Sequence, residues 1–423
     1  MTVLIAGAGI AGLTLGLTLH QIGVPFRIYE AVRELRPLGV GINLQPNAVR
    51  ELFDLDLEEE LLRIGVATRT LGFYTKTGQL IWQEPRGRDA GYTWPQISVH
   101  RGHLQMMLFK ALQKRAGENI VLTGHKATAF LNTADGAELH LAGAEGNVII
   151  RGDAVIAADG IHSAIRRQMY PDEGPPVWGG AILWRGTTRA TPFGDAPGMI
   201  LAGHDTQRFV AYPISAPDPV TGHALINWIA ELRVDPATDW RREDWNRPAD
   251  LRDFLPAFEG WQFDWLDVPG LIRGADAVYE YPMVDRDPVA CWTEGAVTLM
   301  GDAAHPTYPV GSNGASQAIV DARVMGASLA REGVGGPALQ AYEAQIRPRT
   351  AAVTLANRVS GPDAILQQVE DRCGGSFDSI DDVISQEELA THSAKYKKLA
   401  GIDPETLNMQ PPLVPKDIRK DRE

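Results

Sequence analysis

Three glycines and one glutamate near the start of the chain have the spacing of a nucleotide-binding site. Gly7, Gly9 and Gly12 form the pattern G-x-G-x-x-G directly after an apolar run at residues 2–6. Glu30 ends a second apolar run. In a β-α-β unit the glycines permit a tight turn and let backbone N–H groups approach a pyrophosphate, while the acid accepts hydrogen bonds from ribose hydroxyls. The pattern predicts a bound ADP moiety, and it argues against a signal peptide or a membrane span in this stretch.

Two later motifs place an acidic residue at the end of a predicted strand. Asp159 and Gly160 lie in the sequence AADGIHSAIRR. Asp302 lies in LMGDAAHPTYPVGSNGASQAI, which continues through Gly311 and Asn313 into a predicted helix. Because ligands of open α/β sheets bind at the carboxyl ends of the strands, we expect these loops to face the same nucleotide.

Hydrophobic periodicity predicts the elements that position these loops. Buried strands are expected at residues 2–6, 25–29, 120–122, 153–157 and 296–300. Helices are expected from Asn47, from Arg101, over 315–330, from Pro337 and over about 380–399. Pro348 is expected to interrupt the helix that begins at Pro337. The tail PPLVPKDIRKDRE is expected to be loosely ordered.

The order of these elements predicts an α/β chain with two joined domains. A discontinuous, Rossmann-type nucleotide-binding domain is expected from residues 1–70, 97–175 and 285–360. Short β-patterns separated by Pro, Gly and Asp indicate an inserted antiparallel sheet that binds the substrate, from residues 71–96 and 176–284. Residues 361–423 are expected to form a helical C-terminal segment and tail.

Composition narrows the class of protein. The 423 residues carry a formal net charge of −13, which argues against a nucleic-acid partner. Cys291 and Cys373 offer neither a disulfide framework nor metal-ligand spacing, so we expect a cytoplasmic protein without a metal. No other apolar run is long enough to cross a bilayer. We expect a monomer or a homodimer.

Taken together, the three motifs resemble those of the class A, single-component flavin-dependent aromatic hydroxylases, the relatives of para-hydroxybenzoate and salicylate hydroxylase. The resemblance covers residues 1 to about 360. The stretches GVGINLQPNAV, SVHRG, VAYPIS and YPMVDRDP are similar to a narrower group, which contains the 5-methylphenazine-1-carboxylate monooxygenase.

The resemblance implies an FAD-dependent monooxygenase that uses NADH or NADPH and O2. In the family, oxygen adds at flavin C4a, and the hydroperoxide hydroxylates an aromatic or heteroaromatic acid, with or without decarboxylation. The residues that the resemblance assigns to the cofactor are Gly7, Gly9, Ala11, Gly12, Glu30, Val40, Arg101, Ala127, Asp159, Asp302, Gly311 and Asn313. The helix after Asn313 would direct its N–H groups at the reduced, anionic flavin. His305 and His162 are expected to serve loop structure rather than catalysis.

The substrate is expected to lie between the flavin and the inserted sheet. The candidate pocket residues are Trp184, Arg185, Tyr212, Trp228, Tyr308 and Pro309. Arg185 either pairs with a substrate carboxylate or forms a salt bridge within the sheet. Since side chains alternate along strands, some of the aromatic candidates must face away from the pocket.

Three further groups leave alternatives open. Arg166 either forms a structural ion pair or contacts the reductant. Asp285 and Arg286 are interpreted as a structural turn. A plain dehydrogenase explains only the first motif, whereas a flavin halogenase or a non-catalytic flavoprotein that binds an aromatic metabolite remains an alternative function. The segment GWQFDWLDVP departs from the halogenase motif at Phe263 and Val268.

Overall fold

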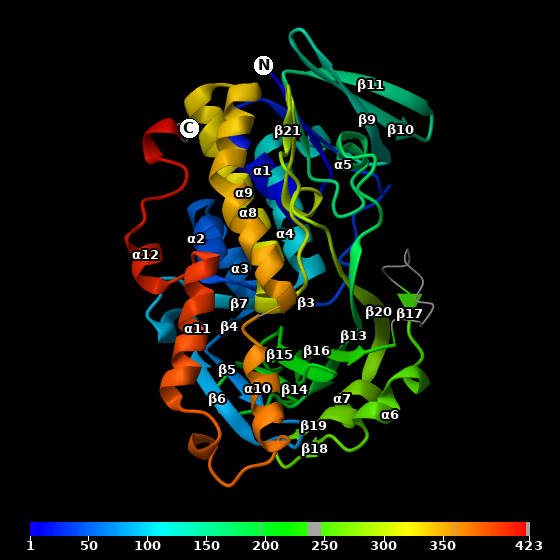
Figure 1. Cartoon of the computed structure of the whole chain (residues 1–423). Coiled ribbons are helices and arrows are strands. Elements are labelled where there is room, and N and C mark those ends of the chain that lie inside the picture. Colours follow the sequence, from blue (N-terminus) through cyan, green and yellow to red (C-terminus); the bar gives the residue numbers. More distant parts are fainter. Residues whose placement is uncertain (195, 236–246, 360, 420–423) are drawn as a thin grey trace.

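The computed structural model of the chain describes residues 1–194, 196–235, 247–359 and 361–419. Figure 1 shows two parts, one above the other in that view. The upper part holds an N-terminal sheet covered by helices, and the lower part holds a larger sheet. The C-terminal helices lie along one side of the molecule.

The N-terminal sheet has the strand order β21-β22-β12-β1-β2-β8 within the described residues. Its strands are β1 (Val3–Ala6), β2 (Phe26–Tyr29), β8 (Val121–Leu122), β12 (Ala154–Ala157), β21 (Thr293–Glu294) and β22 (Val297–Leu299). Neighbours pair in parallel except at β21, which joins β22 antiparallel. All residues of β1 and β12 are buried, as expected for central parallel strands covered on both faces. This confirms the Rossmann-type sheet that the sequence predicts.

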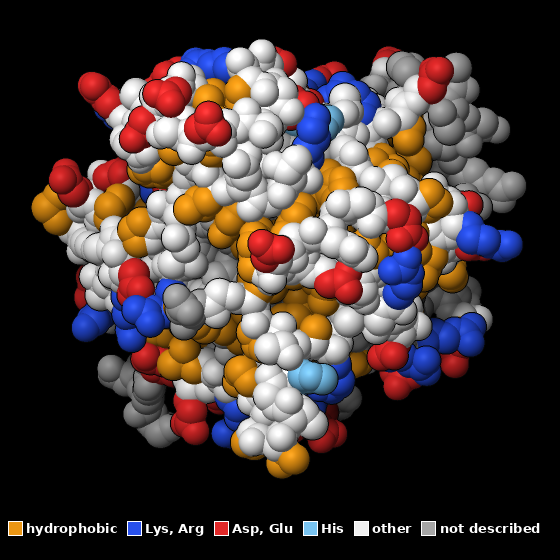
Figure 2. Space-filling model, turned by 90° about the horizontal axis from the view of Figure 1, so that it is seen from below, with side chains coloured by type: hydrophobic (Ala, Val, Ile, Leu, Met, Phe, Trp, Pro, Cys, Tyr) orange, Lys and Arg blue, Asp and Glu red, His pale blue; other side chains and the backbone are white. Residues whose placement is uncertain are grey.

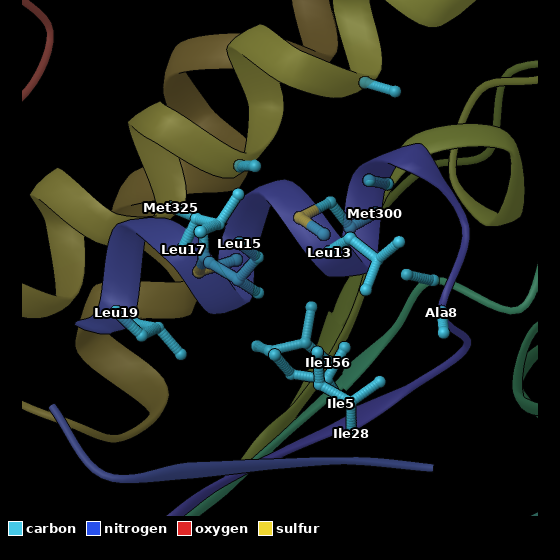
Figure 3. Close-up of a cluster of buried hydrophobic side chains, with 14 of the residues drawn as sticks. Ile5, Ala8, Leu13, Leu15, Leu17, Leu19, Ile28, Ile156, Met300 and Met325 are labelled. Carbon is cyan, nitrogen blue, oxygen red and sulfur yellow. The ribbon is translucent and has the colours of Figure 1, made fainter. Parts of the chain in front are cut away.

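Four long helices belong to this part of the molecule. They are α1 (Ile10–Gln21), α4 (Arg101–Ala116), α8 (Gly314–Glu332) and α9 (Gly336–Val359). In Figure 3, α1 lies between sheet side chains such as Ile5 and Ile156 and the α8 residue Met325, with Leu15 and Leu17 in the same cluster. Because α1 is covered on both sides, it is apolar around most of its circumference.

The predicted interruption of the helix at Pro348 is wrong, whereas a kink at this residue stays a prediction. Helix α9 continues through this residue to Val359. Tyr342 and Ile346, which precede Pro348 by six and two residues, are buried in the core that α9 shares with α8. Packing of that face outweighs the single backbone hydrogen bond that a proline removes.

The large sheet has the order β17-β20-β13-β16-β15-β14-β5-β6 within the described residues. Its strands are β5 (Thr70–Tyr74), β6 (Leu80–Pro85), β13 (Val177–Ala190), β14 (Gly198–His204), β15 (Gln207–Pro213), β16 (Ala224–Arg233), β17 (Arg247–Pro248) and β20 (Ala275–Asp285). Neighbouring strands are antiparallel, as predicted, apart from the parallel pair of β14 and β5. The parallel pair arises where strands from the earlier segment of the chain join the later ones. The domain boundaries themselves stay a prediction.

Shorter elements complete the two parts. A small sheet joins β3 (Gly41–Leu44), β7 (Gln96–His100) and β4 (Gly65–Thr68), and another joins β9 (His125–Thr133), β10 (Gly136–Gly143) and β11 (Gly146–Gly152). The remaining short elements are α2 (Pro46–Asp54), α3 (Glu58–Ile64), α5 (Ala164–Met169), α6 (Leu255–Phe258), α7 (Val268–Arg273), β18 (Gln262–Phe263) and β19 (Leu266–Asp267).

The C-terminal segment differs from the single helix that the sequence predicts. Its described residues form α10 (Ala364–Cys373), α11 (Gln386–Ala400) and α12 (Pro404–Met409). Gly374 ends α10 in a left-handed conformation, which separates it from α11. The following tail is not loose up to residue 419, because Val414 is fully buried and the Arg419 guanidinium donates to the Asp54 carboxylate. Residues 420–423 lie outside the described residues.

No described helix is long and apolar enough to cross a membrane. In the described residues, no cluster of three or more His, Cys, Asp or Glu is placed to hold a metal ion. On the face shown in Figure 2, basic and acidic side chains are interspersed around apolar ones.

Candidate active site

The loop between β1 and α1 is packed so closely that only glycine fits at two of its positions. Gly7 has a φ of +103°, and a Cβ there would lie 2.3 Å from the Ala158 carbonyl oxygen. A Cβ on Gly12 would lie 2.0 Å from the Gly7 carbonyl oxygen. Around Gly9, by contrast, no atom of the described residues lies within 4 Å of an added Cβ. The loop therefore presents backbone to open space at Gly9, as a pyrophosphate site requires.

Glu30 is placed at the same loop. Its carboxylate accepts hydrogen bonds from the backbone N–H of Ala8 (2.7 Å) and of Val32 (3.0 Å). The acid thus fixes the turn after β1 and lies beside the nucleotide loop, at the end of β2.

A cavity of about 500 Å³ opens between the carboxyl ends of the N-terminal sheet and one face of the large sheet. Its upper wall includes many residues that the family resemblance assigns to FAD, namely Gly9, Ala11, Arg101, Asp302, Gly311 and Asn313. Gly160 lines it as well.

Polar groups on this wall fit a bound cofactor. The Asp302 carboxylate and the Arg101 guanidinium face the cavity, and neither forms a hydrogen bond with another described residue. Enclosure by the protein raises the pKa of Asp302, although His305 and Arg101 oppose this shift. One oxygen of Asp159 accepts from the Ala164 N–H (3.0 Å), while its other oxygen, Oδ1, is buried without a partner in the described structure. Asp159 does not itself line the cavity, whereas Asp302 and Arg101 do, and these two unpaired groups fit a polar ligand.

Further assigned residues support the site, and two of them, Val40 and Ala127, lie outside the cavity lining. The Val40 carbonyl accepts from the Arg101 N–H (2.9 Å), which fixes the start of α4. Ala127 is buried on β9 in the core of the upper part and does not line the cavity. Asn313 precedes α8 and forms no capping bond with its first turn in the described structure, so those N–H groups face the cavity side uncapped.

His305 serves the loop rather than the cavity. Its Nε2 pairs with the Asp321 carboxylate (2.5 Å), which also accepts from the Gly301 N–H (3.1 Å). Asp321 raises the pKa of His305 against the opposing effect of burial. His305 does not line the large cavity.

The floor of the cavity follows from strand alternation. Five residues stand opposite one another across β13, β16, β15, β14 and β5, and this central row consists of Arg185, Ile229, Val210, Leu201 and Phe73. It covers four strand spacings, or about 19 Å at roughly 4.8 Å each. The row is apolar except at its Arg185 end.

The prediction that the candidate residues line the pocket is wrong for two of them. Trp184 and Trp228 lie on the opposite face of the large sheet, because each neighbours a cavity-facing residue in its strand. The Trp184 ring stacks on Phe254 at 4.8 Å between centroids. The Trp228 indole N–H donates to the Thr188 hydroxyl (3.0 Å).

Arg185 faces the cavity without an acidic partner among the described residues. Its Nη2 donates to the Gly41 carbonyl (2.8 Å), and its Nε is buried with no partner in the described structure. Its guanidinium lies 5.7 Å from the centroid of the Tyr281 ring. Desolvation lowers the pKa of Arg185, so an anion would gain from pairing with it. The alternative of a salt bridge within the sheet is wrong for the described residues.

Tyr212, Tyr308 and Pro309 line the same cavity. Burial raises the pKa of the Tyr212 phenol to about 12, so Tyr212 is a neutral hydrogen-bonding group at physiological pH. Tyr308 packs with Leu183 and other apolar residues of the cavity wall, and burial raises its pKa to about 12.

The remaining charged groups of the motifs are structural. Arg166 donates to Glu173 and to the Ala304 carbonyl, and Arg286 donates to Glu173 (3.0 Å). Asp285 is fully buried and pairs with Arg358 (2.7 Å). Asp285 ends β20, so the interpretation of Asp285 and Arg286 as a turn is wrong.

The sequence did not reveal several parts of the cavity wall. These are the apolar floor residues Ile229, Val210, Leu201 and Phe73, the acid Glu231, and the C-terminal residues Ser393, Tyr396 and Lys397. Strand alternation would have placed the floor residues once the strand register was known, whereas no local pattern marks the C-terminal ones.

Comparison with known proteins identifies the family. The model of the FAD binding domain matches residues 1–183 and 281–356. Over 84% of this chain, the sequence is 45% identical to phenazine 1,6-dicarboxylic acid hydroxylase PhzS of Lysobacter antibioticus, of which 89% is covered. This chain belongs to the class A flavin-dependent aromatic hydroxylases.

More distant members of the hydroxylase family agree. Salicylate hydroxylase of Pseudomonas putida is 29% identical, with 82% of each chain covered. The solved structure of Klebsiella pneumoniae HpxO, in complex with FAD and uric acid, superposes with a TM-score of 0.71 at 23% identity and covers 96% of both chains. That likeness shows the shared fold. The chain is thus an FAD-dependent aromatic monooxygenase.

Proposed function

We propose that this hydroxylase acts on a fused-ring heteroaromatic carboxylic acid, with a phenazine carboxylic acid as the first candidate. The observation that carries this proposal is the central row of the cavity. A single aromatic ring spans about one strand spacing, and would leave most of the row uncovered. The name of the Lysobacter antibioticus relative, which hydroxylates phenazine 1,6-dicarboxylic acid, supports the same substrate class.

In this proposal Arg185 binds the substrate carboxylate. Its unpaired Nε and lowered pKa support the role, as does its position at the polar end of the row. Tyr212 and Tyr308 would orient the ring system, and the apolar floor would exclude water.

The cofactor is held by the upper wall in this proposal. The Gly9 loop would hold the pyrophosphate, Glu30 the adenosine ribose, and Asp302 a ribityl hydroxyl. Bound FAD, reduced by NADH or NADPH, supplies the activation of O2. The first turn of α8 would stabilise negative charge on the cofactor, because helix N-termini favour anions.

Three finer statements belong to the proposal. Where the attacked carbon carries the carboxylate, formation of the new C–O bond is followed by cleavage of the C–C bond, and the carboxylate leaves as CO2. The chain acts in the cytoplasm, as a monomer or a homodimer, without nucleic acid. The acidic net charge and the two free cysteines, Cys291 and Cys373, support this setting.

Product analysis tests the substrate class. Purified holoenzyme with NADH or NADPH is incubated separately with phenazine, quinoline and benzoic carboxylic acids, and the products are identified by mass spectrometry. We expect oxygenated product mainly from phenazine acids, together with accelerated reductant oxidation. Reductant oxidation that yields only hydrogen peroxide with every phenazine acid, or a clear preference for benzoic acids, would refute the proposed class.

A further inference from the structure

Tyr396 of the C-terminal helix α11 reaches the loop that leads into α8. Its side chain is buried, and its hydroxyl accepts a hydrogen bond from the Asn313 side-chain amide. The same hydroxyl donates to the Asn357 side-chain oxygen at 3.0 Å. Asn357 in turn donates to the Thr307 hydroxyl (2.9 Å). One phenol therefore connects both ends of the loop at residues 307–313.

The middle of this loop packs directly on the same phenol. Gly311 has a φ of +69°, and a Cβ there would lie 2.1 Å from the Tyr396 hydroxyl oxygen. On the other side, the Gln45 side-chain amide donates to the Gly311 carbonyl (3.2 Å). The loop is held between α11 and the residue that precedes α2.

Helix α11 is anchored at the large sheet as well. The Lys397 ammonium donates to the Glu84 carboxylate of β6 (2.9 Å), and the Ser393 hydroxyl donates to the same oxygen. Glu84, Ser393, Tyr396 and Lys397 all line the large cavity. The helix thus spans from an edge strand of the cavity floor to the loop on the cofactor side.

We propose that Tyr396 is a positioning residue, which sets the orientation of the Asn313 amide and the Gly311 backbone toward the bound flavin. The inference rests on the proposed placement of the flavin against this loop. A phenol can donate and accept at once, and phenylalanine can do neither. Its loss would take one partner from each of two amide side chains, the half-buried Asn313 and the buried Asn357, and the loop would lose its fixed geometry.

The test compares Tyr396→Phe with a matched control. Tyr92 is buried to the same extent, and its hydroxyl donates to the Ile402 carbonyl just after α11. Tyr92→Phe therefore removes one buried hydroxyl and one anchor of the same segment, but it touches no residue of the loop. Both variants are loaded with FAD, and the FAD dissociation constant, the visible absorption spectrum and the reduction potential of the bound flavin are measured.

We expect Tyr396→Phe to raise the FAD dissociation constant by about three- to tenfold. We also expect a shifted visible spectrum and a lower reduction potential, because the loop directs its N–H groups less well at negative charge. Tyr92→Phe should leave all three at the wild-type values. If Tyr396→Phe does not fold, Asn357→Ala removes the next bond of the chain and should change the same readouts.

Equal effects of Tyr396→Phe and Tyr92→Phe on the flavin readouts would overturn the positioning role, as would a loss of thermal stability with unchanged flavin properties. A separate result decides whether the proposed substrate is correct. Wild-type protein that binds FAD but oxygenates none of the acids would refute the proposed substrate, whereas the comparison of the two variants would still decide the role of Tyr396.

Discussion

Arg185 carries the most specific claim at the scale of single residues, because it is the cation at the end of an apolar floor. It faces the cavity with an unpaired Nε, and no described carboxylate neutralises it. A charged hydrogen bond to a carboxylate is worth about 1.5–3 kcal/mol, or roughly 10- to 100-fold in affinity.

Arg185→Met should therefore raise KM for the carboxylic acid substrate about 10- to 100-fold, and should change KM for the corresponding amide much less. Steady-state kinetics with both compounds measures the difference. Arg189→Met is the control, since Arg189 is exposed on the same strand. Equal KM values for the acid in Arg185→Met and the wild type would exclude the carboxylate contact.

Replacement of Asp302 should have opposite effects on FAD binding and on the stability of the apoprotein. The surrounding protein raises the pKa of Asp302, although the side chain is still exposed to the cavity, so its charge costs a small amount of folding free energy above the pH where an aspartate ordinarily titrates. That cost disappears as the pH falls below the ordinary value of 3.8. Asp302→Ala should weaken FAD binding about tenfold or more, yet raise the Tm of the apoprotein at pH 7 and not at pH 3.

Flavin fluorescence titration and thermal melts of the apoprotein measure the two effects. Asp135→Ala, at an exposed position, is the control. A variant with wild-type FAD affinity would remove Asp302 from the cofactor site, and an apoprotein destabilised at pH 7 would contradict the stated cause of the pKa shift.

Residue types alone predicted the residues of the upper cavity wall better than those of the floor. Gly9, Asp302 and Asn313 stand in motifs whose spacing reflects backbone geometry around a phosphate and a flavin. Trp184 and Trp228 were predicted to line the pocket because they are aromatic. The register of a strand decides which face of the sheet each side chain lies on, and a shift of one residue moves every side chain to the other face. The register of these strands cannot be predicted from the local sequence.

At the scale of elements, helix α8 links the cofactor loop to the core. Its Arg323 is fully buried and donates to Glu51 (3.1 Å) and Asp54 of α2 and to Gln21 of α1 (2.8 Å). Burial raises the pKa of Glu51, although Arg323 opposes the shift. The guanidinium therefore neutralises buried acids between three helices.

Arg323→Met should lower the free energy of unfolding of the apoprotein by about 3 kcal/mol, because the buried Glu51 then keeps only the Arg50 guanidinium, 3.6 Å away, as a counter-charge. Urea denaturation measures this loss. Adding Glu51→Gln should recover part of it, and Arg331→Met, at an exposed position of the same helix, should have little effect. A loss below 1 kcal/mol in Arg323→Met would show that the buried pair does not stabilise the fold.

Elements with strong periodicity were predictable, and those stabilised by distant contacts were not. The strands β1 and β12 and the helices α1, α4 and α8 follow from apolar patterns. The predicted interruption of α9 at Pro348 was wrong, because packing of α9 on α8 outweighs the local effect of a proline. Helix α10 is short, and its apolar residues pack in one cluster with Leu71, Phe73 and Ile81 of strands far away in the sequence.

At the scale of the whole molecule, the cavity exists because two sheets and a C-terminal segment close around one space. The N-terminal sheet contributes loops, the large sheet contributes the floor, and α11 joins β6 to the loop before α8. The sequence predicted the loops from their motifs and the large sheet from its β-patterns, but not the residues of the floor. The third depends on side-chain contacts between Glu84 and Lys397 and between Asn313 and Tyr396, which no local pattern encodes.

The most direct test of the account is to follow oxygen into the product. Holoenzyme with NADH or NADPH and a phenazine carboxylic acid is incubated under isotopically labelled dioxygen, and the product is analysed by mass spectrometry. The account predicts one labelled oxygen atom in each product molecule. Product oxygen that comes from unlabelled water, or reductant consumption that ends only in labelled hydrogen peroxide, would contradict it.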